Sequence, residues 1–318
     1  MPRFNQFTLA QPHAFVASTT TRVDLPRSGF ITHLDHLLRV DLNTAAAATA
    51  VEDGLSRLVS AYRIRAAGAK SFFDVNDGRL WHFWNMHRYL GQIHVDAIPT
   101  GVAASTIIRQ IMPLHWGFDP LNLFDAKVVI PARDIQNLQS ELVWGAAADI
   151  GVNQTITSAD FTLTVHEISL EPGETVASFW TQGFLLPRFE SRSTPITVQA
   201  NLGFEDDVPV GDTLFQTLLL VLAAAGTRSD AEASEVGVKF PKTRETPLQV
   251  QWQTKLKQSR YLFSLPATLV GTFLLPWEQI SRNPFGLDLK LAQAGDVKLA
   301  LSTILGTGTF RRMHYALG

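Results

Sequence analysis

The chain has 318 residues, of which 46% are hydrophobic and 18% are charged, and its formal net charge is −2. This composition is typical of a globular protein, and it excludes both a disordered chain and the strongly basic surface that would attract nucleic acid. Because the sequence contains no cysteine, it also excludes disulfides, thiolate metal sites and cysteine nucleophiles.

Neither a signal peptide nor a membrane-spanning helix is expected. The first ten residues lack a continuous apolar core, and the longest apolar stretch, residues 218–225, is far shorter than the roughly 18 residues that span a bilayer.

The N-terminal segment, residues 1–27, has weak periodicity and is interrupted by prolines, which predicts an extended arm or an edge segment. Arg3 lies here with Phe4, Phe7 and Leu9. A cation beside aromatic rings can bind a membrane surface, but so short a segment would bind weakly, and packing under a neighbouring subunit explains the same residues equally well. We therefore expect an arm that contacts either a membrane surface or a neighbouring subunit.

The first half of the chain reads as a series of strands. Residues 29–42 form a long apolar segment that alternates towards its end, and residues 138–144 and 161–170 alternate at period two, as half-buried strands do. Asp77-Gly78 between two apolar runs predicts a β-hairpin that includes the aromatic residues 80–84. Further strands are expected at residues 105–116 and 124–130, and residues 51–62 form either a short helix or an irregular connection.

A second strand-rich half follows the strong turn Glu171-Pro-Gly-Glu174. Residues 196–204 and 248–257 alternate strictly, which predicts strands. The apolar run within residues 211–226 fits a capped helix or a buried strand equally well, and the polar residues 227–247 predict a loop. The last strands are expected near residues 285–292 and 297–304, and the predicted domains are an arm (1–27), a first strand-rich domain (28–172) and a second strand-rich domain (173–318).

One pattern of metal-ligating residue types occurs on a predicted strand. In His33-Leu-Asp-His36, alternation places His33 and Asp35 on one face and His36 on the other. Imidazole and carboxylate both bind divalent ions, but no neighbouring residue supplies a third ligand, so an exposed polar strand face is the favoured interpretation. His82 and His87 are spaced for opposite faces of a strand, not for one face of a zinc-binding helix.

Other candidate sites are weaker. Trp81, Phe83 and Trp84 suggest either a sugar-stacking platform or, more simply, core packing. The acidic turn Glu205-Asp-Asp207 could contribute to a calcium site, and Glu141 with Glu167 could form a glycosidase pair, although the sequence does not place their carboxylates together. Since the sequence contains neither a nucleophile elbow nor a P-loop, we expect no catalytic residue, no cofactor and no metal site.

The order of segments resembles the major capsid protein of tectivirus-type phages, which belong to the double jelly-roll lineage shared with the adenovirus hexon. The resemblance covers residues 28–190 most clearly. It rests on the long strand from Gly29 to Leu42, the aromatic segment 80–91, residues 111–123, the edge at 135–144, the strand 161–170 and Gly183-Phe-Leu-Leu-Pro187. The chain is shorter than known examples and lacks a long amphipathic N-terminal helix.

The resemblance implies an all-β chain of two consecutive eight-stranded jelly rolls with short helices in the connections. It also implies a non-enzymatic capsid protein of an icosahedral, membrane-containing virus such as a bacteriophage, which forms pseudo-hexagonal homotrimers. The expected partners are further copies, penton and minor capsid proteins and an internal lipid membrane, without direct nucleic-acid recognition. The expected location is the virion shell, assembled in the host cytoplasm. The alternative is a carbohydrate-binding or carbohydrate-active β-sandwich, which would use the aromatic cluster and a carboxylate pair.

Overall fold

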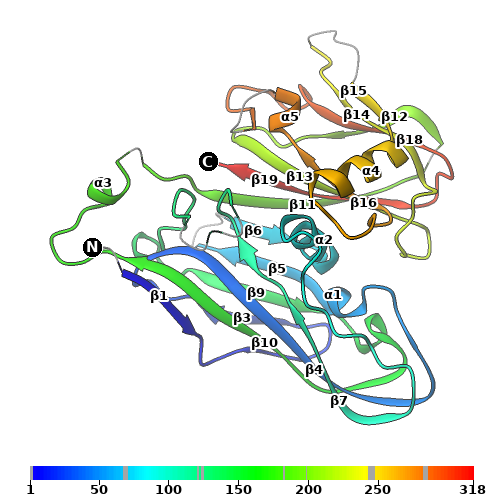
Figure 1. The fold of residues 1–318 in the computed structure, drawn as a ribbon, viewed down its shortest axis with the longest axis horizontal. Helices are drawn as coiled ribbons and strands as arrows, with labels where there is room; N and C mark the ends of the chain where they lie inside the picture. Colours follow the sequence, from blue (N-terminus) through cyan, green and yellow to red (C-terminus); the bar gives the residue numbers. More distant parts are fainter. Residues whose placement is uncertain are drawn as a thin grey trace. The chain divides into compact units, whose positions relative to one another are not determined.

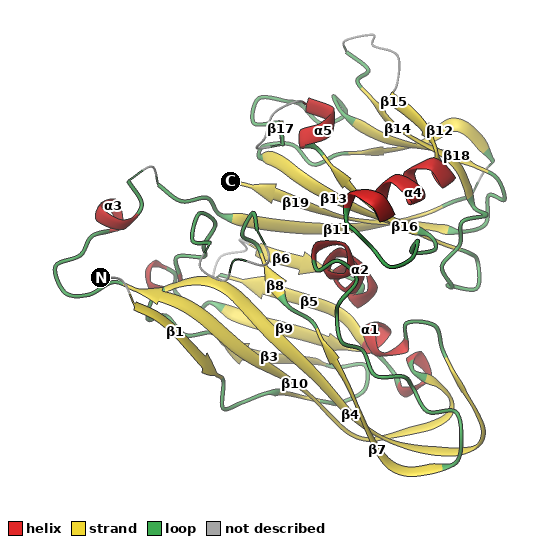
Figure 2. Ribbon diagram, in the orientation of Figure 1, coloured by secondary structure: helices red, strands yellow, loops and turns green. Residues whose placement is uncertain are grey.

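Strands dominate the molecule, and the helices are confined to connections between them (Figure 1). The computed structural model describes residues 3–66, 71–119, 122, 125–181, 183–197, 199–242, 248–281 and 286–318. The chain divides into two units: Met1–Asn85 with Gln92–Phe189, and Met86–Gly91 with Glu190–Gly318. Figure 2 shows that strands prevail in each of them.

The first unit contains two antiparallel sheets. One has the strand order β1-β10-β4-β7, with the short strands β2 beside β10 and β8 beside β4, and the other contains β3-β9-β5-β6. The strands are β1 (Arg3–Thr8), β2 (His13–Ala14), β3 (Thr20–Asp24), β4 (Phe30–Ala50), β5 (Val59–Arg65), β6 (Ser71–Val75), β7 (Ala103–Ile111), β8 (Leu114–His115), β9 (Gln139–Trp144) and β10 (Gly151–Ser169). The helices are α1 (Gly54–Leu58), α2 (Gly78–Arg88), α3 (Val176–Phe179) and the 3₁₀ helices η1 (Ala132–Asp134) and η2 (Ala147–Asp149).

Two long strands, β4 and β10, form the centre of the first sheet and run side by side (Figure 1). They pair from Phe30 with Ile168 to Ala50 with Gly151, across three register shifts. Leu34, Leu38 and Leu42 are fully buried, whereas the residues between them are exposed or half-buried, apart from the buried His36 and Val40 on the same core face. The period-two pattern of the sequence therefore separates a core face from an outer face.

A chain of buried hydrogen bonds connects the two sheets of the first unit. His36 Nδ1 lies 3.0 Å from the carbonyl oxygen of Met112, which can only accept, so this nitrogen carries the proton. The direction of the remaining bonds follows: Tyr62 O–H donates to His36 Nε2 (2.8 Å), Ser140 to Tyr62 (2.7 Å) and His13 Nε2 to Ser140 (2.8 Å). The chain of bonds thus joins β4 and β2 of one sheet to β5 and β9 of the other, with every group neutral.

The second unit also contains two sheets, with the orders β16-β13-β19-β11 and β12-β18-β14-β15, and β17 beside β13. Strand β11 (Pro187–Pro195) carries the chain into the larger segment of this unit, which begins at Glu190. The other strands are β12 (Ala200–Asp207), β13 (Thr213–Leu222), β14 (Ala233–Lys239), β15 (Leu248–Gln251), β16 (Thr272–Pro276), β17 (Leu287–Asp288), β18 (Lys298–Thr303) and β19 (Thr309–Leu317), and the helices are α4 (Trp252–Leu262) and α5 (Glu278–Ser281).

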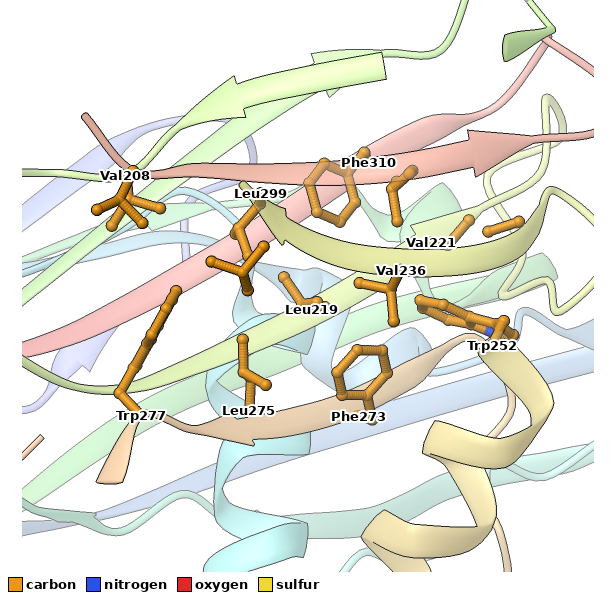
Figure 3. Close-up of a cluster of buried hydrophobic side chains, with 14 of the residues drawn as sticks. Val208, Leu219, Val221, Val236, Trp252, Phe273, Leu275, Trp277, Leu299 and Phe310 are labelled. Atoms are coloured by element: carbon orange, nitrogen blue, oxygen red, sulfur yellow. The ribbon is translucent and has the colours of Figure 1, made fainter. Parts of the chain in front are cut away.

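The core of the second unit is built from both sheets and from α4 (Figure 3). Leu219 and Phe310 come from one sheet and Leu299 from the other, and Trp252 lies 5.0 Å from the ring of Phe273. Because each of these side chains is at most 3% exposed, the hydrophobic effect holds the two sheets face to face.

The predicted hairpin around Asp77-Gly78 is wrong, because residues 78–88 form the helix α2. The Asp77 carboxylate accepts a hydrogen bond from the backbone N–H of Arg79 (2.9 Å), as a residue at a helix start does. A side chain at Gly78 would come within 2.3 Å of the carbonyl oxygen of Ser56, so the glycine is needed for close packing and not for a hairpin turn. His82 and His87 therefore lie on a helix.

Other elements also differ from expectation. The strand predicted at residues 248–257 ends at Gln251 and continues as α4, whereas the ambiguous run at 211–226 is the strand β13 and the predicted loop at 227–247 contains β14. Residues 125–130 form only isolated bridges, and residue 124 lies outside the described residues, as does Val198 of the predicted 196–204 strand.

The predicted domain limits differ from the two units. The described residues 3–24 of the predicted arm belong to the sheets of the first unit, because β1 pairs with β10 from Arg3–Ser169 to Thr8–Thr164 and β3 pairs with β9. The units separate after Phe189 rather than at residue 172. The reason is that the segment after the 171–174 turn packs back on the first unit: the rings of Trp180 and Phe184 lie 4.6 and 5.7 Å from that of Phe30.

Candidate functional site

The predicted arm residues lie on or next to β1, at the edge of the first sheet. Arg3 Nε is 2.8 Å from Glu171 Oε1, so its guanidinium already has an anionic partner. Phe4 is 45% exposed, whereas Phe7 and Leu9 are half-buried. Of the four residues, Phe4 thus presents the clearest apolar surface to a partner.

A second exposed apolar surface lies on the outer face of the same sheet. Leu37 on β4 is directly paired with Ile111 on β7. Ile107 precedes Ile111 by four residues on β7 and therefore lies on the same face. These side chains are 36–41% exposed. We call Leu37, Ile107 and Ile111 the outer apolar patch; nothing in the sequence pattern distinguished them from core residues.

The structure does not bring the predicted glycosidase pair together. Glu141 lies on β9 in one sheet and Glu167 on β10 in the other. Burial by itself would raise the pKa of Glu141, but hydrogen bonds from Arg22 and Arg63 hold this pKa below its usual range. A catalytic acid needs the opposite shift. Glu167 accepts hydrogen bonds from Ser28 (2.8 Å) and Ser169 (3.2 Å).

The other weak candidates are also accounted for by structural contacts. Trp81, Phe83 and Trp84 are at most 3% exposed and therefore pack in the core instead of presenting a sugar platform. The acidic residues 205–207 end the strand β12 instead of forming a turn, and they are paired with cations. Glu205 binds Lys239 and Lys298, and Arg312 pairs with Asp206. These ion pairs engage both carboxylate oxygens of Glu205 and one of Asp206.

His33 and Asp35, which the sequence placed on one strand face, belong to a larger cluster. His33 on β4 is paired with His166 of β10 on one side and with His115 of β8 on the other, so three imidazoles form a row across three adjacent strands. The ring centroid of His33 lies 3.8 Å from the centroid of His166 and 4.1 Å from that of His115. We call His33, Asp35, His115 and His166 the histidine cluster.

Asp35 holds the flanking members of this cluster. Its Oδ1 is 3.0 Å from His115 Nε2 and its Oδ2 is 2.9 Å from His166 Nε2. Burial by itself would raise the pKa of Asp35, but these two hydrogen bonds hold this pKa well below its usual range, so the group is a carboxylate. Burial, together with the neighbouring histidines, lowers the pKa of His33 to about 2 and keeps it neutral. Sequence reasoning missed His115 and His166, because 80 and 131 residues separate them from Asp35.

No protein-family model matches the sequence, and a search of curated proteins gives no match. Solved structures do match. The STIV MCP, a viral major capsid protein, superposes with a TM-score of 0.81 and 17% identity, covering 99% of this chain and 96% of that chain.

The chain has the double jelly-roll fold.

Two further structures agree over the whole chain. The major capsid protein P2 from bacteriophage PM2 matches with a TM-score of 0.56 and 11% identity over 100% of this chain and 97% of that one. The Faustovirus major capsid protein matches with a TM-score of 0.60 and 9% identity over 100% and 90%. At these identities the likeness concerns the fold, and it confirms the all-β double jelly roll and the resemblance inferred from the order of segments.

Among the described residues, no helix is long and apolar enough to cross a bilayer.

Proposed function

We propose that this chain is the major capsid protein of an icosahedral virus. The observation that carries the proposal is the match of the complete double jelly roll to the STIV MCP, at a TM-score of 0.81 over 99% of this chain and 96% of that one. A match over both chains includes the connections as well as the barrels, and three of the matching structures are of major capsid proteins.

The chemistry of the surface supports a role in assembly. The outer apolar patch exposes Leu37, Ile107 and Ile111 on one sheet face, where a second copy could bury them. The formal net charge of −2 opposes close packing of identical subunits only weakly. We infer that the functional unit is a pseudo-hexagonal homotrimer with interfaces of at least roughly 2,000 Å².

The remaining features of the proposal follow from this role. The protein would reside in the virion shell after assembly in the host cytoplasm, and it would contact penton and minor capsid proteins. It would have no enzymatic activity, because the candidate carboxylates Glu141 and Glu167 are engaged in structural contacts.

Light scattering coupled to size exclusion, with electron microscopy of the same fractions, tests the proposal. We expect a trimer mass and hexagonal particles. Replacement of Ile111 by serine should weaken the trimer, while replacement of the fully exposed Leu291, which is 99% exposed and remote from the outer apolar patch in sequence, should not. A monomer at all concentrations from micromolar to millimolar would contradict the capsid role.

We also propose that Arg3, Phe4, Phe7 and Leu9 face the base of the shell. Because Arg3 is already paired with Glu171, packing against a neighbouring subunit is favoured over contact with the phosphates of an internal membrane. Replacement of Phe4 by serine should leave the trimer intact and reduce assembly of shells. Loss of binding to anionic vesicles with normal shell assembly would instead support a membrane contact, and no change in either would contradict both.

A further inference from the structure

The histidine cluster contains one nitrogen whose lone pair has no partner. Thr32 Oγ1 lies 3.1 Å from the carbonyl oxygen of His166, to which it must donate its proton. The same hydroxyl oxygen is 3.1 Å from His33 Nδ1, so it accepts a hydrogen bond from the N–H of that nitrogen. His33 Nε2 therefore carries a bare lone pair.

This lone pair is buried. His33 is 4% exposed, and its Nε2 has no hydrogen-bond partner within the described part of the chain. A buried polar atom without a partner is unfavourable, and native structures normally supply one. A neutral imidazole that donates through one nitrogen to a neighbouring oxygen and presents the other is the arrangement of a metal-ligating histidine.

Two further ligand atoms stand next to it. One ligand atom from each of His33, Asp35 and His166 lies within 4.8 Å of the other two. Ligands about 2.1 Å from a tetrahedral zinc ion lie ~3.4 Å apart, so small side-chain rotations would bring the three together. The distance of 2.9 Å between His166 Nε2 and Asp35 Oδ2 would lengthen slightly as the ion enters between them.

We propose that His33 Nε2, His166 Nε2 and Asp35 Oδ2 bind a divalent transition-metal ion of the zinc class. Two imidazoles and one carboxylate suit zinc or cobalt better than the oxygen-preferring calcium and magnesium. When the ion binds, His166 gives up its Nε2 proton to solvent, and Nδ1 carries the single proton of the neutral ring. His115 keeps its hydrogen bond to Asp35 Oδ1 and orients the carboxylate, and water fills the fourth position.

The position of the site indicates its role. The two imidazoles and the carboxylate come from the adjacent strands β4 and β10, and His115 adds β8, so the ion would cross-link the centre of the first sheet. The side chain of Asp35 is 38% exposed, which gives an ion access from solvent. The function of the ion would be to stabilise the first unit.

The test uses the full chain, dialysed against a chelator and titrated with Zn²⁺ by calorimetry and with Co²⁺ by visible absorption. We expect one ion per chain, the visible bands of a four-coordinate Co²⁺ and a rise in melting temperature with Zn²⁺ but not with Mg²⁺. Asp35→Asn and His166→Gln should each weaken Zn²⁺ binding at least tenfold and remove the Co²⁺ bands.

A matched control is His94→Gln, because His94 also pairs with an aspartate, Asp96, at 3.0 Å but on an exposed segment. This variant should bind Zn²⁺ as the unmodified chain does. Circular dichroism of each metal-free variant shows whether it is folded, and His33→Gln serves if either first choice is not. The proposal is overturned if folded Asp35→Asn and His166→Gln bind Zn²⁺ normally, if His94→Gln abolishes binding, or if the unmodified chain gives no saturable binding.

Discussion

The buried hydrogen-bond chain in the first unit should make its stability sensitive to a single oxygen atom. Tyr62→Phe removes the hydroxyl that donates to His36 Nε2 (2.8 Å) and accepts from Ser140 (2.7 Å). The phenyl ring keeps its stacked contact with Trp81, 5.0 Å between centroids, so hydrophobic packing is preserved. Only hydrogen bonding changes.

The expected loss follows from the groups that remain. His36 is 1% exposed, so its Nε2 would be left buried without a donor, at a cost of about 1–3 kcal/mol. Ser140 is fully buried and would retain only its bond with His13. We therefore expect the free energy of unfolding of the first unit to fall by about 2 kcal/mol, which corresponds to a melting temperature roughly 4–8 °C lower.

Urea unfolding followed by circular dichroism measures this change, with calorimetry to resolve the two units. Tyr261→Phe is the control, because Tyr261 is 87% exposed and its replacement should alter stability by less than about 0.5 kcal/mol. Equal stabilities of Tyr62→Phe and Tyr261→Phe would show that the hydrogen-bond chain contributes nothing and would refute the reasoning.

Three further predictions concern other parts of the two units. Burial lowers the pKa of His13 to about 4, against 6.5 when unfolded, so the contribution of neutral His13 to the free energy of unfolding is complete above pH 6.5 and falls by about 1.4 kcal/mol per pH unit as the pH drops towards 4. Urea midpoints at pH 7 and 5 should therefore decline more steeply for the unmodified chain than for His13→Gln, and parallel declines would contradict this. Gly286→Ala should destabilise the second unit by more than about 2 kcal/mol, because φ is +96° and a Cβ would lie 2.2 Å from the carbonyl oxygen of Leu214. Gly173→Ala also has a positive φ, +90°, but no neighbouring atom within 4 Å, so it should destabilise the first unit by only about 1 kcal/mol; similar losses in calorimetry would disprove the steric argument. Asp206→Asn should cost about 3 kcal/mol in urea unfolding, because Arg312 is 1% exposed and would lose its ion-pair partner, and a loss below about 0.5 kcal/mol would mean that the pair is not formed.

The sequence alone determined the class of fold where its period was unambiguous. In β4 and β10, apolar residues alternate with polar ones over many positions, and only a strand with one buried face satisfies that pattern. The pattern failed at Trp252 and Leu256, because a spacing of four residues lies on one face of a helix as well as of a strand, and the helix α4 is formed. At Asp77-Gly78 the local signal for a hairpin was overridden, since Asp77 caps α2 and Gly78 allows the close approach of Ser56.

Only the tertiary structure decided which distant residues meet. From the sequence, His33 and Asp35 had no third ligand, because His115 and His166 lie in other segments of the chain. Pairing of β4 with β8 and β10 placed all three histidines in one row, and the register of those pairings is set by long-range packing of the sheet. A shift of one residue would turn His166 to the opposite face and dissolve the cluster, so its existence is a property of strand register rather than of any motif.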